Sequence, residues 1–313
     1  MRLAPIALFV YNRPEHTLKT LEALAQNDLA SQSELFVFCD GPKHNAEAKT
    51  NKAIKKVRAI VSRKQWCNKV TIYESDTNKG LADSIVTGVS EVVNKFGKII
   101  VLEDDIVTAK GFLSFMNKAL ELYKYEDRVM QISGFMVPSK VELEQTGLFR
   151  CPGSWGWATW NSSWKYYNHN TSELVSKITK EDINTFNLDD NYHYYDQLVD
   201  NDSGKLKTWV VRWYASMHYQ NGLCLYPKKS LIQNIGFGAG ATNTSSNVFE
   251  SYLFNKKNLV ATLPLNKIAV IHESESYALA FKSFYAYQNY LWSKPTMQER
   301  LLSKINRVWN LFR

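Results

Sequence analysis

Blocks of apolar residues recur along the first 102 positions of the chain, separated by segments with a helical pattern. The apolar runs predict buried strands, at residues 5–11, 34–39, 70–73 and 98–102. The intervening segments carry apolar residues at helical spacing and predict helices, over residues 15–26, 45–62 and 81–95. This alternation favours a mostly parallel sheet with helices on both faces.

The pattern becomes less regular after residue 111. It predicts a helix over residues 112–123 and strands at 129–133 and 222–226. Residues 155–195 are rich in Trp and Tyr, which suits a binding surface more than a second Rossmann-like half.

Composition narrows the class of protein without choosing its partner. The 313 residues include 45% hydrophobic residues, enough for a substantial core. A net charge of +8 would suit nucleic acid, an anionic membrane surface or a diphosphate. No apolar run reaches the roughly 18 residues needed to cross a bilayer, and residues 3–11 are too short for a secretory signal. We therefore expect a cytoplasmic protein.

The four cysteines are widely spaced and form no CxxC pair: Cys39, Cys67, Cys151 and Cys224. This spacing indicates neither a zinc site nor a disulfide framework. We expect reduced, mostly buried thiols.

Polar residues follow each predicted strand of the first third. They are Asn12 and Arg13, then Asp40, then residues 76–80, then Glu103, Asp104 and Asp105. Ligands bind outside the carboxyl ends of strands in open α/β sheets, so these residues define the candidate site.

The acidic triplet at 103–105 needs a compensating positive charge, because neighbouring carboxylates repel one another. Mg²⁺ or Mn²⁺ fits, since such ions take one or two carboxylates and complete their shell with phosphate oxygens. The alternative is a solvated acidic turn that caps a helix starting near Gly111.

Four motifs in this order resemble the GT-A glycosyltransferases, particularly bacterial family 2-type enzymes and the N-acetylglucosaminyltransferase I group. The motifs are Val10-Tyr-Asn-Arg-Pro14, Cys39-Asp40, Asn78-Lys-Gly80 and Val101-Leu-Glu-Asp-Asp-Ile106. The likeness continues more weakly through residues 153–157 and 209–238. It implies a Rossmann-like α/β GT-A domain, with a nucleotide-sugar-binding half at 1–110, an acceptor-binding half at 111–272 and a helical tail at 273–313.

The resemblance also implies roles for the strand-end residues. Asn12 and Arg13 would contact the nucleotide, and Asp40 its base. Asn78, Lys79 and Gly80 would approach the ribose and diphosphate. Asp105 would bind the metal, and Asp104 would contact the sugar or ribose. Glu103 would support these two residues without contacting the ligand. Two alternatives stay open: Arg13 as a surface ion-pair partner, and Asp40 as a turn former before Gly41.

The chain departs from the family where a catalytic base is expected. The N-acetylglucosaminyltransferase I pattern has a carboxylate after a Trp, whereas this chain reads Trp209-Val210-Val211. The remaining candidates are nearby acids, Asp190, Asp196, Asp200 and Asp202. We favour Asp196, because apolar neighbours such as Tyr194 and Tyr195 would raise the pKa of a carboxylate. A role as an ordinary helix-surface residue is the alternative.

Two tryptophans and one loop are candidates for the acceptor side. Trp155 and Trp157 could stack on a sugar, although core packing explains such residues equally well. The Gly-rich stretch at 236–244 lies where related enzymes close a lid over the donor. Arg212 could pair with Asp104 or a phosphate, or form a structural salt bridge.

Residues 296–313 have the spacing of a basic amphipathic helix. Such a helix would either bind the inner face of the cell membrane, beside a lipid-linked acceptor, or dock on the protein's own core.

These observations predict a metal-dependent hexosyl- or N-acetylhexosaminyltransferase of polysaccharide or lipopolysaccharide biosynthesis, and the resemblance implies that it inverts the anomeric configuration. Its donor would be a nucleoside-diphosphate sugar, with a UDP-sugar favoured, and its acceptor a glycan or lipid-linked saccharide. A sugar-nucleotide nucleotidyltransferase is one alternative, but Asn12-Arg13-Pro14 is not its Gly-rich loop. A nucleic-acid-binding protein is the other, but the basic residues form no recognised motif, so we expect no nucleic-acid partner.

Overall fold

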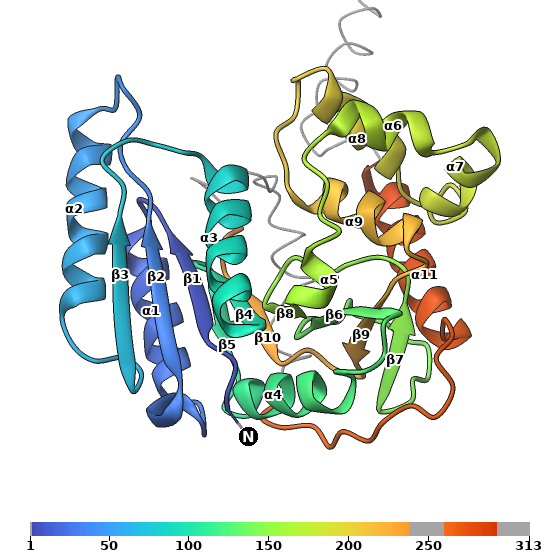
Figure 1. Ribbon diagram of the computed structural model, residues 1–313, viewed down its shortest axis with the longest axis horizontal. Helices are drawn as coiled ribbons and strands as arrows, with labels where there is room; N and C mark the ends of the chain where they lie inside the picture. The colour runs from blue at the N-terminus through green and yellow to red at the C-terminus, as the bar shows by residue number, and fades with distance from the viewer. Residues whose placement is uncertain (1, 238–259, 293–313) are drawn as a thin grey trace, which may run out of the picture.

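The computed structural model describes residues 2–237 and 260–292 (Figure 1). Its strands are β1 Ile6–Val10, β2 Glu34–Cys39, β3 Lys69–Glu74, β4 Lys98–Glu103, β5 Ile106–Thr108, β6 Val129–Ser133, β7 Thr146–Phe149, β8 Trp157–Trp160, β9 Leu223–Pro227 and β10 Ile232–Asn234. Its helices are α1 Pro14–Ala25, α2 Ala48–Ser62, α3 Leu81–Phe96, α4 Phe112–Leu122, α5 Asn161–Trp164, α6 Thr171–Lys177, α7 Lys180–Phe186, α8 Tyr194–Asp202, α9 Val210–Tyr219 and α11 Glu275–Trp292, with a short 3-10 helix η1 at Ala30–Gln32.

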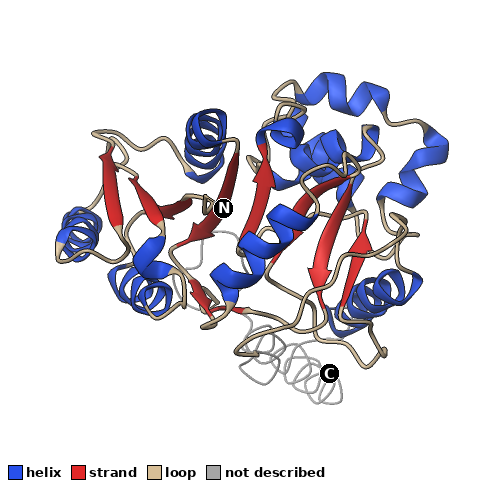
Figure 2. Ribbon diagram, turned by 60° about the horizontal axis from the view of Figure 1, so that its bottom comes forward, coloured by secondary structure: helices blue, strands red, loops and turns tan. Residues whose placement is uncertain are grey.

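One eight-stranded sheet organises the described chain, in the order β3-β2-β1-β4-β8-β6-β9-β7. The first four strands pair in parallel, whereas β8 and β7 run antiparallel to their neighbours. A small second sheet pairs β5 with β10. Helices cover both faces of the large sheet (Figure 2). The predicted α/β class, with a mostly parallel central sheet and flanking helices, is confirmed.

The apolar run of β1 is continuous because both faces of the sheet are covered. Ala7 and Phe9 belong to the hydrophobic core on one face, and Ile6, Leu8 and Val10 belong to the core on the other. All five residues are buried. The strand is therefore held from both sides, and the polar residues that follow it have a fixed position.

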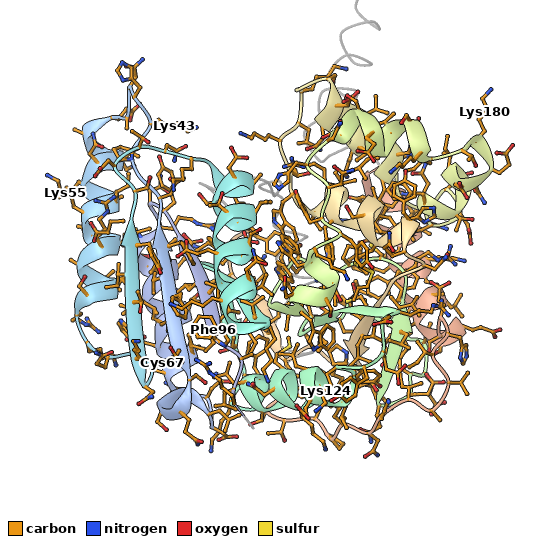
Figure 3. The ribbon with its side chains drawn as sticks, in the orientation of Figure 1. Lys43, Lys55, Cys67, Phe96, Lys124 and Lys180 are labelled. Atoms are coloured by element: carbon orange, nitrogen blue, oxygen red, sulfur yellow. The ribbon has the colours of Figure 1, made fainter. Side chains whose placement is uncertain are left out.

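The polar loops after β1 to β4 gather at one edge of the sheet. Parallel register aligns Phe9 of β1 with Glu103 of β4. In Figure 3, Lys43 follows β2 at the top of the molecule, whereas Cys67 and Phe96, which precede β3 and β4, lie toward the bottom. The carboxyl ends of these strands thus share the upper edge, as the sequence predicts.

The later part of the chain differs from its prediction. Strands β7 and β8 and the helices α5 to α9 were not predicted. Several large rings of the aromatic-rich segment 155–195 pack inward: Trp157 and Phe186 are fully buried, and Trp164 is 4% exposed. The expectation of an aromatic binding surface there is therefore wrong for these rings, which form core.

The four cysteines are free and buried, as predicted. Burial raises the pKa of Cys39, Cys67 and Cys151 to about 12, so these thiols stay protonated at neutral pH.

Helix α11 packs on the far edge of the sheet, where Phe281 stacks on Phe149 of β7 with ring centroids 4.6 Å apart. The predicted amphipathic helix at 296–313 lies outside the described residues. Among the helices that the structure describes, none is long and apolar enough to span a membrane.

Candidate active site

Arg13 is fixed at the junction between β1 and α1. Pro14 occupies the first position of α1, where its missing N–H costs no hydrogen bond. The carbonyl oxygen of Arg13 accepts hydrogen bonds from the backbone nitrogen and the hydroxyl of Thr17, both at 2.9 Å. The guanidinium therefore starts from an ordered backbone and reaches the neighbouring strand end.

Asp104 and Asp105 directly follow β4 and are only 4% and 8% exposed. The backbone carbonyl of Asp104 accepts a hydrogen bond from the Thr20 hydroxyl at 2.9 Å. The carbonyl of Asp105 accepts one from the backbone nitrogen of Ile235 at 2.9 Å. Helix α4 has no acidic residue in its first turn, so the alternative that the acids cap this helix is not supported.

One guanidinium nitrogen of Arg13 bridges the two carboxylates, donating to Asp104 Oδ1 and, at 2.9 Å, to Asp105 Oδ2. The compensating charge that the sequence requires is thus at least partly supplied by Arg13. Burial alone would lower the pKa of Arg13, but the two carboxylates raise it, so the guanidinium stays charged.

Burial raises the pKa of two acids of the triplet, Glu103 and Asp104. Burial, reinforced by Asp105 and Asp104, raises the pKa of Glu103 to about 8. Burial raises the pKa of Asp104 to about 6, although Arg13 opposes the shift. The pKa shift of Glu103 is the larger of the two, because Arg13 opposes the effect of burial more strongly at Asp104.

The donor atoms of Asp105 fit a hard divalent cation. Its Oδ2 accepts from Arg13, whereas its Oδ1 has no hydrogen-bond partner among residues 2–237 and 260–292. The same residues contain no group of three or more His, Cys, Asp or Glu side chains placed to hold a metal. A Mg²⁺ or Mn²⁺ ion here would thus depend on water and phosphate oxygens for most of its shell, which is usual for Mg²⁺.

Asp40 has a different position from the one expected. Its Oδ1 accepts from the backbone nitrogens of Gly41 and Lys79, at 2.9 and 2.8 Å. Its Oδ2 accepts from Asn78 Nδ2 and the Gly80 nitrogen, at 2.9 and 3.0 Å. Four hydrogen bonds fill the acceptor sites of a carboxylate. Asp40 therefore holds the 78–80 loop against β2 and does not offer a free acceptor to a nucleotide base, which corrects the sequence-based expectation.

The Gly-rich stretch begins against the acidic pair. A Cβ atom on Gly236 would lie 2.1 Å from Asp105 Oδ2 and 3.0 Å from an Arg13 guanidinium nitrogen. Only glycine allows the backbone this approach. Strand β10, which pairs with β5 directly after Asp105, brings Gly236 there. Residues 238–244 of the predicted lid lie outside the described residues.

Helix α1 supplies supports that were not predicted. The His16 ring Nε2 lies 3.1 Å from the carbonyl oxygen of Ile235, and Thr20 anchors Asp104. Thr17 and Thr20 are fully buried. The sequence offered one sign of these supports: two threonines lie on the apolar face of a predicted helix, and buried hydroxyls need hydrogen-bond partners.

The two candidate tryptophans have different surroundings. Trp155 is half-buried and packs edge-on against Phe135 and Phe237, at centroid distances of 4.7 and 5.7 Å. It therefore lies beside the segment that contacts Asp105. Trp157 is fully buried and stacks on Trp209 at 4.9 Å. The prediction that Trp157 stacks on an acceptor sugar is not compatible with this packing.

The apolar setting expected for the base Asp196 is not observed. Asp196 lies in the first turn of α8, its side chain is 72% exposed, and its Oδ2 lies 3.8 Å from the ring Nδ1 of His193. The other three candidates are also at the surface: Asp190, Asp200 and Asp202. Asp196 as the base stays a prediction that the geometry does not support.

The remaining predicted residues lie near the same edge or elsewhere. Asn12 is half-buried between β1 and Arg13, and Lys79 is exposed on the loop held by Asp40. Arg212 does not pair with Asp104: it donates to the carbonyl of Thr208 at 3.0 Å and lies over the ring of Tyr167.

Comparison with known proteins gives only distant likeness. No family model matches the chain, and no curated protein matches it. Among solved structures, Staphylococcus aureus TarS aligns at 16% identity and a TM-score of 0.30, covering 46% of this chain and 24% of TarS. TarS residues 1–349 align at 13% identity and a TM-score of 0.39, covering 73% of this chain and 59% of that structure. A UDP-glucose pyrophosphorylase complexed with UDP-glucose aligns at 10% identity and a TM-score of 0.35, covering 72% of this chain and 90% of that structure. The aligned region is thus under two thirds of either TarS chain, and these values assign no activity.

Proposed function

We propose that this protein is a glycosyltransferase that moves a sugar from a nucleoside-diphosphate donor to a hydroxyl group of a glycan or lipid-linked saccharide. One observation carries the proposal: two buried carboxylates and a guanidinium meet at the carboxyl edge of parallel strands, where such sheets bind ligands. The order of the four sequence motifs around this edge supports the same function.

A diphosphate at this site would need positive charge beyond that of Arg13, because the guanidinium already pairs with Asp104 and Asp105. The exposed Lys79 supplies one such charge, on the loop that Asp40 fixes. A Mg²⁺ or Mn²⁺ ion held by Asp105 would neutralise charge that develops on the departing nucleoside diphosphate. Asp104, already anchored by Arg13, would orient the sugar or ribose.

The acceptor side rests on fewer observations. Trp155 lies beside the start of the Gly-rich stretch and has a half-buried ring, so it is our candidate for stacking on a sugar. We keep an inverting displacement and a UDP-sugar donor as part of the proposal, because the sequence motifs imply them.

Thermal unfolding with and without Mn²⁺ tests the proposal. We expect UDP, GDP or dTDP to stabilise the protein only when Mn²⁺ is present, by about 2.7 kcal/mol at a hundredfold excess over Kd. Nucleoside monophosphates, which lack the second phosphate, should give much less. The preferred base would identify the donor class for a transfer assay.

Asp105→Ala should remove the Mn²⁺-dependent part of this stabilisation and lower sugar transfer by about 100-fold or more. Asp127→Ala, which removes an exposed carboxylate from another part of the surface, is the matched control and should change neither. Equal stabilisation with and without Mn²⁺, unchanged in Asp105→Ala, would refute the metal assignment. Absence of stabilisation by any nucleoside diphosphate would refute the donor site.

A further inference from the structure

The net charge of the chain is concentrated in one short segment. Residues 43–69 contain nine lysine and arginine residues but a single acid, Glu47, which gives a net charge of +8. The rest of the chain has 29 basic and 29 acidic residues, so this segment alone accounts for the +8 of the whole chain. A cluster of one sign of charge of this size is a candidate binding surface for an anionic partner.

Most of these basic side chains point to solvent from helix α2 and its flanks. Eight are exposed: Lys43, Lys49, Lys52, Lys55, Lys56, Arg63, Lys64 and Lys69. Helix α2 forms the outer side of the molecule next to β3, and Lys55 projects outward from it (Figures 1 and 3). We call these eight residues the basic face.

The basic face lacks counter-ions from the protein itself. Arg58, the ninth basic residue, pairs with Glu74 at 3.0 Å. No residue of the basic face forms an ion pair with a carboxylate within the described parts of the chain. Like charges at this density repel one another, which favours an external anionic partner.

The apolar side of α2 is already used. Ile54, Val57 and Val61 are at most 4% exposed and belong to the core beneath the helix. The helix therefore has no free apolar side to insert into a bilayer, and any contact through the basic face is electrostatic. Adsorption on headgroups is the mode of binding that this arrangement allows.

The side chains of the basic face favour a fluid anionic surface over nucleic acid. Seven of the eight are lysines, which carry compact charges without the planar fork that arginine uses to bind a phosphate in a defined geometry. The one Trp in the segment, Trp66, is only 2% exposed, with Arg63 and Lys64 over its ring. No exposed Trp, Tyr or Phe is thus present between residues 43 and 69 to stack on bases.

We propose that the basic face of α2 binds the anionic surface of a phospholipid membrane. The contact would hold the protein at the membrane independently of residues 296–313. It does not depend on the proposed sugar transfer, since vesicle binding is measured without donor or acceptor.

Co-sedimentation of the full chain with vesicles tests this contact. We expect binding to vesicles of equimolar phosphatidylcholine and phosphatidylglycerol, none to phosphatidylcholine alone, and loss of binding as salt rises above the point where the screening length falls below about 10 Å. Replacing Lys49, Lys52 and Lys56 together by Glu should weaken binding to anionic vesicles at least about tenfold.

The matched control replaces three exposed lysines elsewhere, Lys140, Lys180 and Lys229, by Glu. It changes the net charge equally and should retain most of the binding. Unchanged thermal unfolding shows that each variant folds. If the variant with three Glu substitutions does not fold, a variant with Gln at Lys49, Lys52 and Lys56 replaces it.

Three results would overturn the proposal. Equal loss in both triple variants would mean that only the net charge matters. Full binding by the α2 variant would place the contact elsewhere, for example in residues 296–313. Salt-dependent binding of duplex or single-stranded DNA without binding to anionic vesicles would assign the basic face to nucleic acid instead.

Discussion

The carboxyl edge of β1 to β4 and the aromatic region around β8 are both buried, yet they are stabilised differently. At the edge, charged and polar groups satisfy one another: Arg13 bridges two carboxylates, and Asp40 accepts four hydrogen bonds. Around β8, tryptophan rings stack, and two buried polar atoms, Trp157 Nε1 and the Tyr167 hydroxyl, have no hydrogen-bond partner in the described structure.

The interactions at the edge fix the positions of polar side chains, whereas those around β8 mainly bury apolar area. Directional bonds at the edge fix side chains in one geometry, which a ligand site requires. Ring contacts near β8 contribute burial without demanding one orientation of each polar atom. Substitutions in the two regions should therefore differ in how they affect stability and nucleotide binding. Three experiments test this difference, from the largest expected effect to the smallest.

Arg13→Ala should produce the largest loss of stability. It leaves Asp104 and Asp105 buried without their counter-ion, and breaking a buried pair in this way costs about 3 kcal/mol. Chemical denaturation of the metal-free protein measures the loss. Mn²⁺ should recover part of it, because a cation at Asp105 would replace the missing charge.

Arg2→Ala is the control for this measurement. Arg2 pairs with Glu34 at 3.2 Å, but its side chain is 68% exposed, so the substitution should cost less than about 1 kcal/mol. A similar small loss in Arg13→Ala would mean that solvent, and not Arg13, compensates the acidic pair.

The edge was predictable and the aromatic region was not, because strands of the two parts of the chain pair differently. In the first part each strand pairs with strands of the same part, in the order β3-β2-β1-β4, so alternating patterns in the sequence reveal the sheet directly. In the second part β8 lies between β4 and β6, and β9 lies between β6 and β7. Such pairing joins residues far apart in the chain, and short strands such as β7 carry no pattern that identifies their neighbours.

Residue roles at the edge were predictable only in part. The acid cluster could be identified because consecutive carboxylates follow a buried strand at the edge where α/β sheets bind ligands. That Arg13 reaches both acids depends on the pairing of β1 with β4. That Gly236 packs against Asp105 depends on the pairing of β5 with β10. For Asp40 the sequence left two interpretations open, and only the positions of the 78–80 amides decide between them.

Asp40→Ala should have an intermediate effect. It removes the acceptor for the backbone nitrogens of Gly41, Lys79 and Gly80, which we expect to cost about 2 kcal/mol because part of this loop can turn to water. Hydrogen exchange should accelerate at the amides of Lys79 and Gly80. Nucleoside diphosphates should bind about tenfold more weakly, with their order of preference unchanged.

The opposite pattern would support the original interpretation of Asp40. If Asp40 contacted the base, its removal would change the preference among UDP, GDP and dTDP while exchange at the 78–80 amides stayed the same. Asp40→Asn sharpens the test, because its amide group would face the donors of Asn78 and Gly80 and so restore only half of the hydrogen bonds.

The smallest effect concerns the aromatic region, where Trp157→Phe and Trp213→Phe form a matched pair. Both rings are fully buried, so each substitution removes a similar apolar area. Trp213 Nε1 donates to Gln131 Oε1 at 2.8 Å, and its loss leaves a buried acceptor unpaired. Trp157 Nε1 has no partner within the described residues, so its loss relieves an unsatisfied donor. Urea denaturation should therefore show Trp213→Phe to be the less stable variant by about 1 kcal/mol, with nucleotide binding intact in both. A greater loss in Trp157→Phe would mean that the packing of its ring on Trp209 contributes more than the hydrogen bond of Trp213.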